Sequence, residues 1–226
     1  HKYWYGFEDK VTKPLGFRVE FILDPITKER WELVKEEHDL VTYKKGEMVT
    51  YFPNHSNYYM ERITQTFDQI KDIEKLFVLA SSAMIGWKES PFKIYENDPN
   101  RHEKIMYPDY QSTQNIQLVQ EVLRHTKVAV LNMPSTIQLQ CWAAGVHCII
   151  PKHDWGIESK SKGTQYNVTD ADILCEPDQV KQAVEGVLSG KIDKTKEMKE
   201  MAEKWGGVSL GNPTDNMLKL LNECQN

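Results

Sequence analysis

Hydrophobic positions along this chain follow two alternating patterns from residue 48 onward. Short continuous apolar runs, typical of strands buried on both faces, occupy residues 48–52, 76–80, 104–107, 128–131, 147–150 and 171–175. Between them, apolar residues recur at helical spacing over residues 58–73, 114–125, 135–144 and 177–188. Two more helical segments, 194–205 and 213–224, follow the last strand. This alternation predicts an α/β fold, a Rossmann-like parallel sheet with helices on both faces.

The first 47 residues have a different pattern. Residues 18–23 and 31–34 are β-type runs on either side of the turn-rich stretch 24–28, which predicts a short hairpin. We therefore expect residues 1–47 to be a hairpin and linker, or the remnant of a preceding domain. Residues 48–226 are expected to form the Rossmann-like domain. The stretches 81–103 and 152–166 contain prolines, glycines and charges, and are expected to be loops.

Composition narrows the function classes. The chain has 226 residues, of which 40% are hydrophobic and 27% charged, as in ordinary globular domains. A net charge of −5 argues against nucleic-acid binding through a broad basic face. No apolar run approaches the ~20 residues of a membrane helix. Four cysteines without a CxxC pair favour reduced thiols and a cytoplasmic protein.

The stretch from Pro134 to Pro151 carries the clearest chemical signal. It reads as a turn, a helix and a buried strand, with Ser135 and Thr136 at the start of the helix. A hydroxyl at this position caps free backbone N–H groups, and those N–H groups together with the helix dipole favour an anion such as phosphate. An ordinary capped crossover helix has the same pattern, so the stretch alone leaves both interpretations open.

Three segments lie at the carboxyl ends of predicted strands or just beyond them. They are residues 54–57, 106–108 and 134–136. In open α/β sheets, ligands bind outside the carboxyl ends of the strands. These three segments are therefore expected to surround one ligand, although each also fits a simple capping or packing role.

The order of these segments resembles the C-terminal, nucleotide-sugar-binding half of a GT-B glycosyltransferase. The resemblance rests on MVTYFPNHSNYYMERI, KIMYP, VAVLNMPSTIQLQCWAAGVHCIIP and ADILCEPDQVKQAVEGVLSG, and covers roughly residues 48–190. The family usually carries a ribose-binding Glu five residues before the glycine that ends the third segment's helix. Here Gln140 stands at that position. An amide oxygen still accepts hydrogen bonds, but without the strength of a charged carboxylate.

The resemblance implies a role for each candidate residue. Gln140 would bind the ribose, and His55 would be the catalytic group. The remaining assignments are Ser135, Thr136, Ser56 and Asn57 for the donor diphosphate, Met106 and Tyr107 for the base, and His153 and Asp154 for the sugar.

The implied reaction is transfer of a sugar from a nucleotide-diphosphate sugar to an acceptor hydroxyl, in glycan or polysaccharide synthesis. It implies no metal and no cofactor, since the helix N-terminus would stabilise the leaving diphosphate. Expected partners are the nucleotide-sugar donor, a glycan or other hydroxyl acceptor and a separate N-terminal domain; neither nucleic acid nor a membrane span is expected. The alternatives are a non-catalytic ligand-binding or interaction domain, a sugar-nucleotide epimerase and another doubly wound enzyme. The sequence lacks a GxGxxG motif, which argues against a dinucleotide dehydrogenase. It also lacks GxxxxGK[ST] and GxSxG, which argues against a P-loop ATPase and a serine hydrolase, respectively.

Overall fold

The computed structural model of the protein describes residues 47–53, 60–80, 89–99, 105–106, 119, 122–135, 137–153, 168–206 and 222. The strands are β1 (Met48–Phe52), β2 (Leu76–Leu79), β3 (Ile105–Met106), β4 (Thr126–Leu131), β5 (His147–Pro151) and β6 (Asp172–Cys175). The helices are α3 (Met60–Ile70), α7 (Ile137–Ala144), α9 (Val180–Leu188) and α10 (Thr195–Gly206), with short 3-10 helices η3 (Pro91–Tyr95) and η4 (Pro177–Gln179).

The strands form one sheet in the order β3-β2-β1-β4-β5-β6, and every neighbouring pair is parallel. This is the strand order of a Rossmann-like doubly wound sheet. The predicted fold class is therefore confirmed. The direction of winding reverses between β1 and β4, which lie side by side at the centre, and this reversal opens a crevice at their carboxyl ends.

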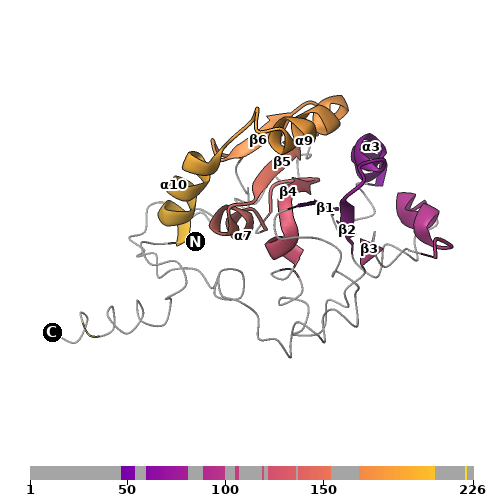
Figure 1. Ribbon diagram of the computed structural model, residues 1–226, viewed down its shortest axis with the longest axis horizontal. Coiled ribbons are helices and arrows are strands. Elements are labelled where there is room, and N and C mark those ends of the chain that lie inside the picture. Colours follow the sequence, from indigo (N-terminus) through magenta and orange to yellow (C-terminus); the bar gives the residue numbers. More distant parts are fainter. Residues whose placement is uncertain are drawn as a thin grey trace, which may run out of the picture.

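Helices cover both faces of the sheet (Figure 1). On one face α7 packs against α10 and β5, and on the other α3 and α9 pack together and α9 contacts β4 and β5. Helix α7 ends at Ala144, and the next residue, Gly145, has a φ of 71°, a left-handed value that favours glycine. The Val146 N–H donates to the Cys141 carbonyl at 2.8 Å and closes this helix end.

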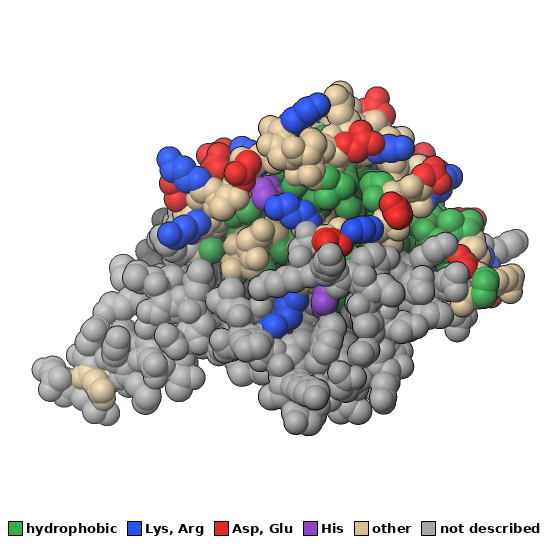
Figure 2. All heavy atoms as spheres, in the orientation of Figure 1, with side chains coloured by type: hydrophobic (Ala, Val, Ile, Leu, Met, Phe, Trp, Pro, Cys, Tyr) green, Lys and Arg blue, Asp and Glu red, His purple; other side chains and the backbone are tan. Residues whose placement is uncertain are grey.

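The outer surface carries charges of both signs. Figure 2 shows acidic and basic side chains intermixed over the described part of one face. None of the described helices is both long and apolar enough to cross a membrane.

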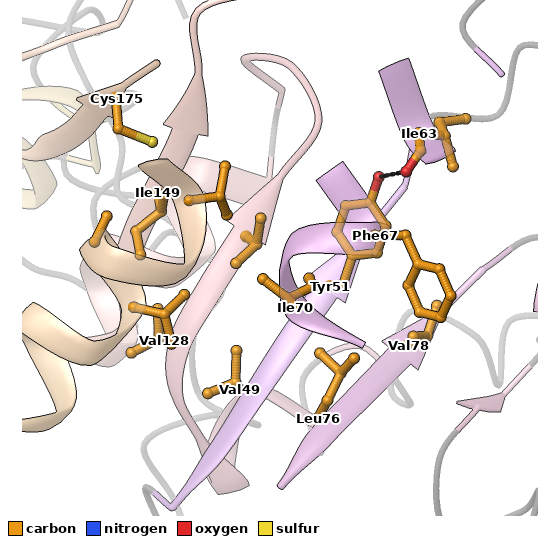
Figure 3. Packing of buried hydrophobic residues seen from close by; sticks show 14 of the residues in the cluster. Val49, Tyr51, Ile63, Phe67, Ile70, Leu76, Val78, Val128, Ile149 and Cys175 are labelled. Carbon is orange, nitrogen blue, oxygen red and sulfur yellow. Dashed lines mark hydrogen bonds between the residues drawn. The ribbon is translucent and has the colours of Figure 1, made fainter. Parts of the chain in front are cut away.

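Alternate residues of β1 point into two separate cores. Met48 and Phe52 pack toward α7 and α10, whereas Val49 and Tyr51 pack toward α3 and α9. Figure 3 shows the second core, in which Tyr51 and Phe67 lie beside the aliphatic side chains of β1, β2, β4 and β5. The continuous apolar runs predicted for the strands follow from this burial on both faces.

The largest difference from the sequence prediction lies between β2 and β3. Residues 91–95 form η3 instead of a loop. Pro91 occupies its first turn, the Ser90 hydroxyl accepts a hydrogen bond from the Phe92 N–H, and Phe92 and Tyr95 are buried against Phe67. Element ends shift by a few residues elsewhere, and the predicted hairpin at 18–34 and helix at 213–224 lie outside the described residues, apart from Asn222.

Candidate functional site

The candidate site lies at the carboxyl ends of β1, β4 and β5. β1 and β4 remain paired to their ends, where the Asn132 N–H lies 3.5 Å from the Phe52 carbonyl oxygen. β5 ends at Pro151, and the chain then turns through Lys152 to His153. These ends flank the reversal in strand order, the usual location of ligands in such sheets.

A buried polar cluster lies directly beneath this edge. The Asn132 side chain is 2% exposed, and its Oδ1 accepts hydrogen bonds from the Tyr51 hydroxyl at 3.2 Å and the Thr66 hydroxyl at 3.1 Å. The Tyr51 hydroxyl also lies 3.3 Å from the Ile63 carbonyl oxygen, as Figure 3 shows. Burial raises the pKa of Tyr51 well above its usual value of 10.0, so this hydroxyl keeps its proton and remains a donor.

His153 joins the same cluster. Its Nε2 lies 3.0 Å from the Thr66 hydroxyl oxygen, and its side chain is almost fully buried. Since the Thr66 hydroxyl donates its proton to Asn132, the His153 ring donates from Nε2 and leaves Nδ1 as an acceptor. Burial lowers the pKa of His153, and the positive charge of Arg62 lowers it further. The ring is therefore held neutral near pH 7.

The start of α7 is braced by a glutamine side chain. The Ser135 N–H donates to Gln138 Oε1 at 2.7 Å, and the Gln138 N–H donates to the Ser135 carbonyl oxygen at 3.1 Å. The first of these contacts is one half of a capping box. The Ser135 N–H, one of the donors expected to face an anion, is thus already occupied by Gln138.

Gln140, two residues further along α7, is in the opposite situation. Its side-chain oxygen is shielded from solvent and has no hydrogen-bond partner in the described structure. The side chain as a whole is only half-buried. An orphaned buried acceptor costs about 1–3 kcal/mol, and because this oxygen is shielded from solvent it can meet a donor from outside the protein only after the amide turns.

The sequence-predicted residues fall into separate hydrogen-bond groups. Ser135 is joined to Gln138, whereas His153 is joined to Thr66 and through it to Asn132. For Met106 only the position at the end of β3 is described. The other candidates, His55, Ser56, Asn57, Tyr107, Thr136 and Asp154, lie outside the described residues.

Sequence reasoning missed the polar cluster. Thr66 sits on the buried face of α3 between Ile63 and Phe67, where the helical pattern leads one to expect an apolar residue. Asn132 directly follows the apolar strand β4. A polar residue that interrupts an apolar stripe, and another that ends a buried strand, were the available signals.

The described part of the chain contains no candidate metal site. Within it, no group of three His, Cys, Asp or Glu side chains is placed to hold a metal ion. The absence of a metal requirement remains a prediction.

Comparison with known proteins supports the fold. No protein-family model matches the chain, and no curated protein matches it. Several solved structures do match. One is a glycosyltransferase from Rickettsia africae ESF-5, with a TM-score of 0.52 and 13% identity over 92% of this chain and 55% of that one. Another is Anabaena Alr3699/HepE in complex with UDP-glucose, with a TM-score of 0.51 and 6% identity over 92% of this chain and 56% of that one. A variant of the wall teichoic acid polymerase TagF also matches (TM-score 0.53, 9% identity, 95% and 51%).

These structures share the fold at very low sequence identity. The chain spans about half the length of each of these three solved chains. It therefore has the α/β architecture of one half of a GT-B glycosyltransferase, as the sequence resemblance implies.

Proposed function

We propose that this chain is the donor-binding half of a glycosyltransferase, which transfers a sugar from a nucleotide-diphosphate sugar to an acceptor hydroxyl in glycan or polysaccharide synthesis. The observation that carries the proposal is the orphaned oxygen of Gln140 on α7. It stands at the position where the resemblance places the ribose-binding residue, on the helix that begins at the carboxyl end of β4. One structural neighbour, HepE, was solved with UDP-glucose.

In this proposal Gln140 accepts a hydrogen bond from the ribose diol. The terminal amide torsion of glutamine has a broad energy profile, so a rotation turns the oxygen toward the incoming hydroxyl. The hydroxyl of Ser135 and the N-terminus of α7 face the diphosphate, and the helix dipole stabilises its charge as the bond to the sugar breaks. Thr136, Ser56 and Asn57 complete the phosphate contacts, and Met106 and Tyr107 flank the base.

The sugar and acceptor sides of the proposal rest on the histidines. His153 and Asp154 bind the transferred sugar, and His55 is the proposed proton acceptor for the incoming hydroxyl. His153 is neutral and hydrogen-bonded to Thr66, which suits a residue that orients a sugar hydroxyl through its Nδ1. A separate N-terminal domain supplies the acceptor site, and the donor is a substrate, so no cofactor is required.

The described cysteines fit a reducing compartment. Cys141, Cys148 and Cys175 are buried free thiols. A cytoplasmic location is part of the proposal.

Ligand binding tests the proposal directly. Thermal unfolding is followed with UDP, GDP, CDP and ADP, because only a ligand of the folded state raises its midpoint. One of them is expected to raise it, and Ser135→Ala with Thr136→Ala should abolish the rise. No shift with any of the four at millimolar concentration would overturn the proposed donor site.

The ribose contact has a sharper test. Wild-type protein should bind the ribonucleotide more tightly than its 2′-deoxy analogue, and Gln140→Leu should reduce this preference by about tenfold, the effect of one lost hydrogen bond. Gln182→Leu, at an exposed glutamine of α9, is the matched control and should leave the preference intact. An unchanged preference in Gln140→Leu would remove Gln140 from the ribose site.

A non-catalytic ligand-binding or interaction domain is the second candidate. It is favoured by one observation, the amide of Gln140 at a position that the family usually fills with Glu. Nucleotide binding without sugar transfer, measured after adding the separate N-terminal domain, would support this candidate over the transferase. Release of an isomerised nucleotide sugar would instead support the epimerase alternative.

A further inference from the structure

Asp172 is a buried carboxylate at the start of β6. It is 5% exposed, and burial raises the pKa of its carboxyl group, although hydrogen bonds from Thr169, Trp142 and Gln138 oppose this. No lysine or arginine is among the groups that act on its pKa in the described part of the chain. An acidic side chain kept in such a place without a cation is costly, so its hydrogen bonds must compensate for that cost.

Every partner of this carboxylate is a donor. Oδ1 accepts from Trp142 Nε1 at 3.1 Å. Oδ2 accepts from Gln138 Nε2 at 2.9 Å, from the Thr169 N–H at 2.8 Å and from the Thr169 hydroxyl at 3.1 Å. This pattern fits an ionised carboxylate, whose two oxygens both accept. A protonated acid or an amide would place a donor, O–H or NH₂, at one of these two positions.

This arrangement fixes the orientation of Gln138. Because Asp172 only accepts, the NH₂ group of Gln138 must point toward it, and the Gln138 oxygen must then point the other way. That oxygen accepts the Ser135 N–H at 2.7 Å. Gln138 is 2% exposed, so water does not compete for either end of its amide. The chain of bonds runs from β6, through α7, to the turn that precedes α7.

We propose that Asp172 is a positioning residue, which acts through Gln138 to hold the Ser135 turn in the conformation that the diphosphate site requires. This inference rests on the proposed function for its ligand. It assigns the two glutamines of α7 distinct roles: Gln138 is used inside the protein, and Gln140 is left for the donor. Asp172 touches no ligand in this scheme.

The substitution Asp172→Asn isolates the role. Asparagine has the same shape but only one acceptor atom, so its NH₂ must face either Trp142 Nε1–H or the donors of Gln138 and Thr169. The orientation of Gln138 is then no longer imposed. Gln138→Met removes both ends of the bridge while keeping a side chain of similar length.

The first measurement needs no ligand. Amide hydrogen exchange at Ser135 is compared with the global opening rate in wild type, Asp172→Asn, Gln138→Met and the double variant. Ser135 exchange should rise on the order of tenfold beyond the global change in each single variant, since one hydrogen bond to a charged network is lost. The double variant should add little, because both residues act on the same bond.

The second measurement uses UDP, GDP, CDP and ADP alongside their nucleosides. Asp172→Asn should weaken the nucleoside diphosphate by about tenfold and leave the nucleoside unchanged, because only the phosphate contacts depend on the turn. Thr126→Val is the control, since Thr126 lies in a buried polar pair with Thr50 at the amino end of the sheet. It should lower stability without changing the ratio of the two affinities.

The outcomes separate the two proposals. If wild type binds none of the four diphosphates, the proposed function fails, and with it the ligand assigned to this turn. If the diphosphate binds but Asp172→Asn changes neither Ser135 exchange nor the affinity ratio, the positioning role fails and the proposed function stands. Additive effects in the double variant would likewise overturn the connection through Gln138.

Discussion

The two ends of strand β5 carry buried histidines with different kinds of partner. His147, at the amino end, is 3% exposed, and His153, just beyond the carboxyl end, is 8% exposed. Burial lowers the pKa of both rings, so both are neutral near pH 7. The first is held by one neighbouring segment, and the second is linked to side chains from several elements.

At the amino end the contacts fasten a helix. The Lys194 N–H donates to His147 Nε2 at 3.1 Å. Asp193 Oδ1 lies 3.3 Å from the same Nε2 and accepts hydrogen bonds from the N–H and hydroxyl of Thr195, where α10 begins. Asp193, Lys194 and Thr195 are consecutive residues at the start of α10, so His147 contacts a single segment, although it lies 46 and 47 positions from the first two.

At the carboxyl end the partners come from several different elements. Thr66 of α3, Asn132 after β4 and Tyr51 of β1 meet His153 although they are far apart in sequence. Such a cluster requires the whole sheet to be in place, and this fixes its geometry. The bonds of His147 thus reach a single segment and secure a helix, whereas the bonds of His153 join side chains from four parts of the fold and shape a site.

The largest expected effect comes from removing the centre of the long-range cluster. Asn132→Leu leaves the hydroxyls of Tyr51 and Thr66 without their shared acceptor, so the free energy of unfolding should fall by about 2–4 kcal/mol. Urea unfolding measures it. Thr126→Val removes the bonds of this hydroxyl to the Thr50 hydroxyl and to the Val122 carbonyl at the amino end, and should cost about 1–2 kcal/mol. Equal losses in the two variants would contradict the contrast between the ends.

Lowering the pH should weaken both ends. The rings take up protons more readily in the unfolded chain, where the pKa of histidine is about 6.5. The unfolded state therefore binds more protons, and stability should be complete above this pH and decline as the pH falls below it. Urea unfolding between pH 7.5 and 5.5 should show a shallower decline for both His147→Gln and His153→Gln. A wild-type slope in both variants would show that neither ring contributes.

A smaller effect is expected at the exposed part of the amino end. The hydroxyl and N–H of Thr195 lower the pKa of Asp193 to about 2, so its contribution is present above the usual carboxyl pKa of 3.8 and is lost as the pH falls toward 2. Asp193→Ala should slightly lower the unfolding midpoint at pH 7 and speed amide exchange at Thr195. The difference from wild type should vanish near pH 2, and a constant difference would point to lost packing instead.

The smallest effect is expected at the surface beside His153. Lys152 Nζ lies 2.7 Å from Glu176 Oε1, but 47% and 51% of the two side chains are exposed. Lys152→Ala should therefore change the free energy of unfolding by less than about 0.5 kcal/mol. A loss above 1 kcal/mol would mean that this pair supports the carboxyl end and is more than a solvated contact.

The strands and most helices could be predicted because their patterns are local. The run 48–52 became β1 with the predicted bounds, and residues 147–150 became β5 with one added residue. The 3-10 helix at 91–95 could not be predicted in this way, because Phe92 and Tyr95 are buried by a neighbour, Phe67, that the local sequence does not contain. Short 3-10 turns have too few residues to show a period.

The site could be predicted only in part, because some of its contacts join residues that are far apart in the sequence. The start of α7 and the position of Gln140 follow from hydroxyl and small-residue signals within one segment. The roles of Gln138 and Asp172 depend on a contact between residues 34 positions apart. An isolated acidic residue in the apolar run at 171–175 gives no indication of which donors it will meet.

The central position of β1 also determines how this chain can fold. β1 pairs with β4 as well as with β2, and Thr50 and Thr126, whose hydroxyls form a hydrogen bond between β1 and β4, are 76 positions apart in the sequence. During synthesis on the ribosome, β1 therefore has one unpaired edge until β4 has been made. Closing so long a loop costs entropy and slows the formation of the native β1–β4 pair. Until residue 131 has left the ribosome, the β4-facing edge of β1 has unpaired backbone groups. Such an edge can pair with the wrong strand or be bound by a chaperone.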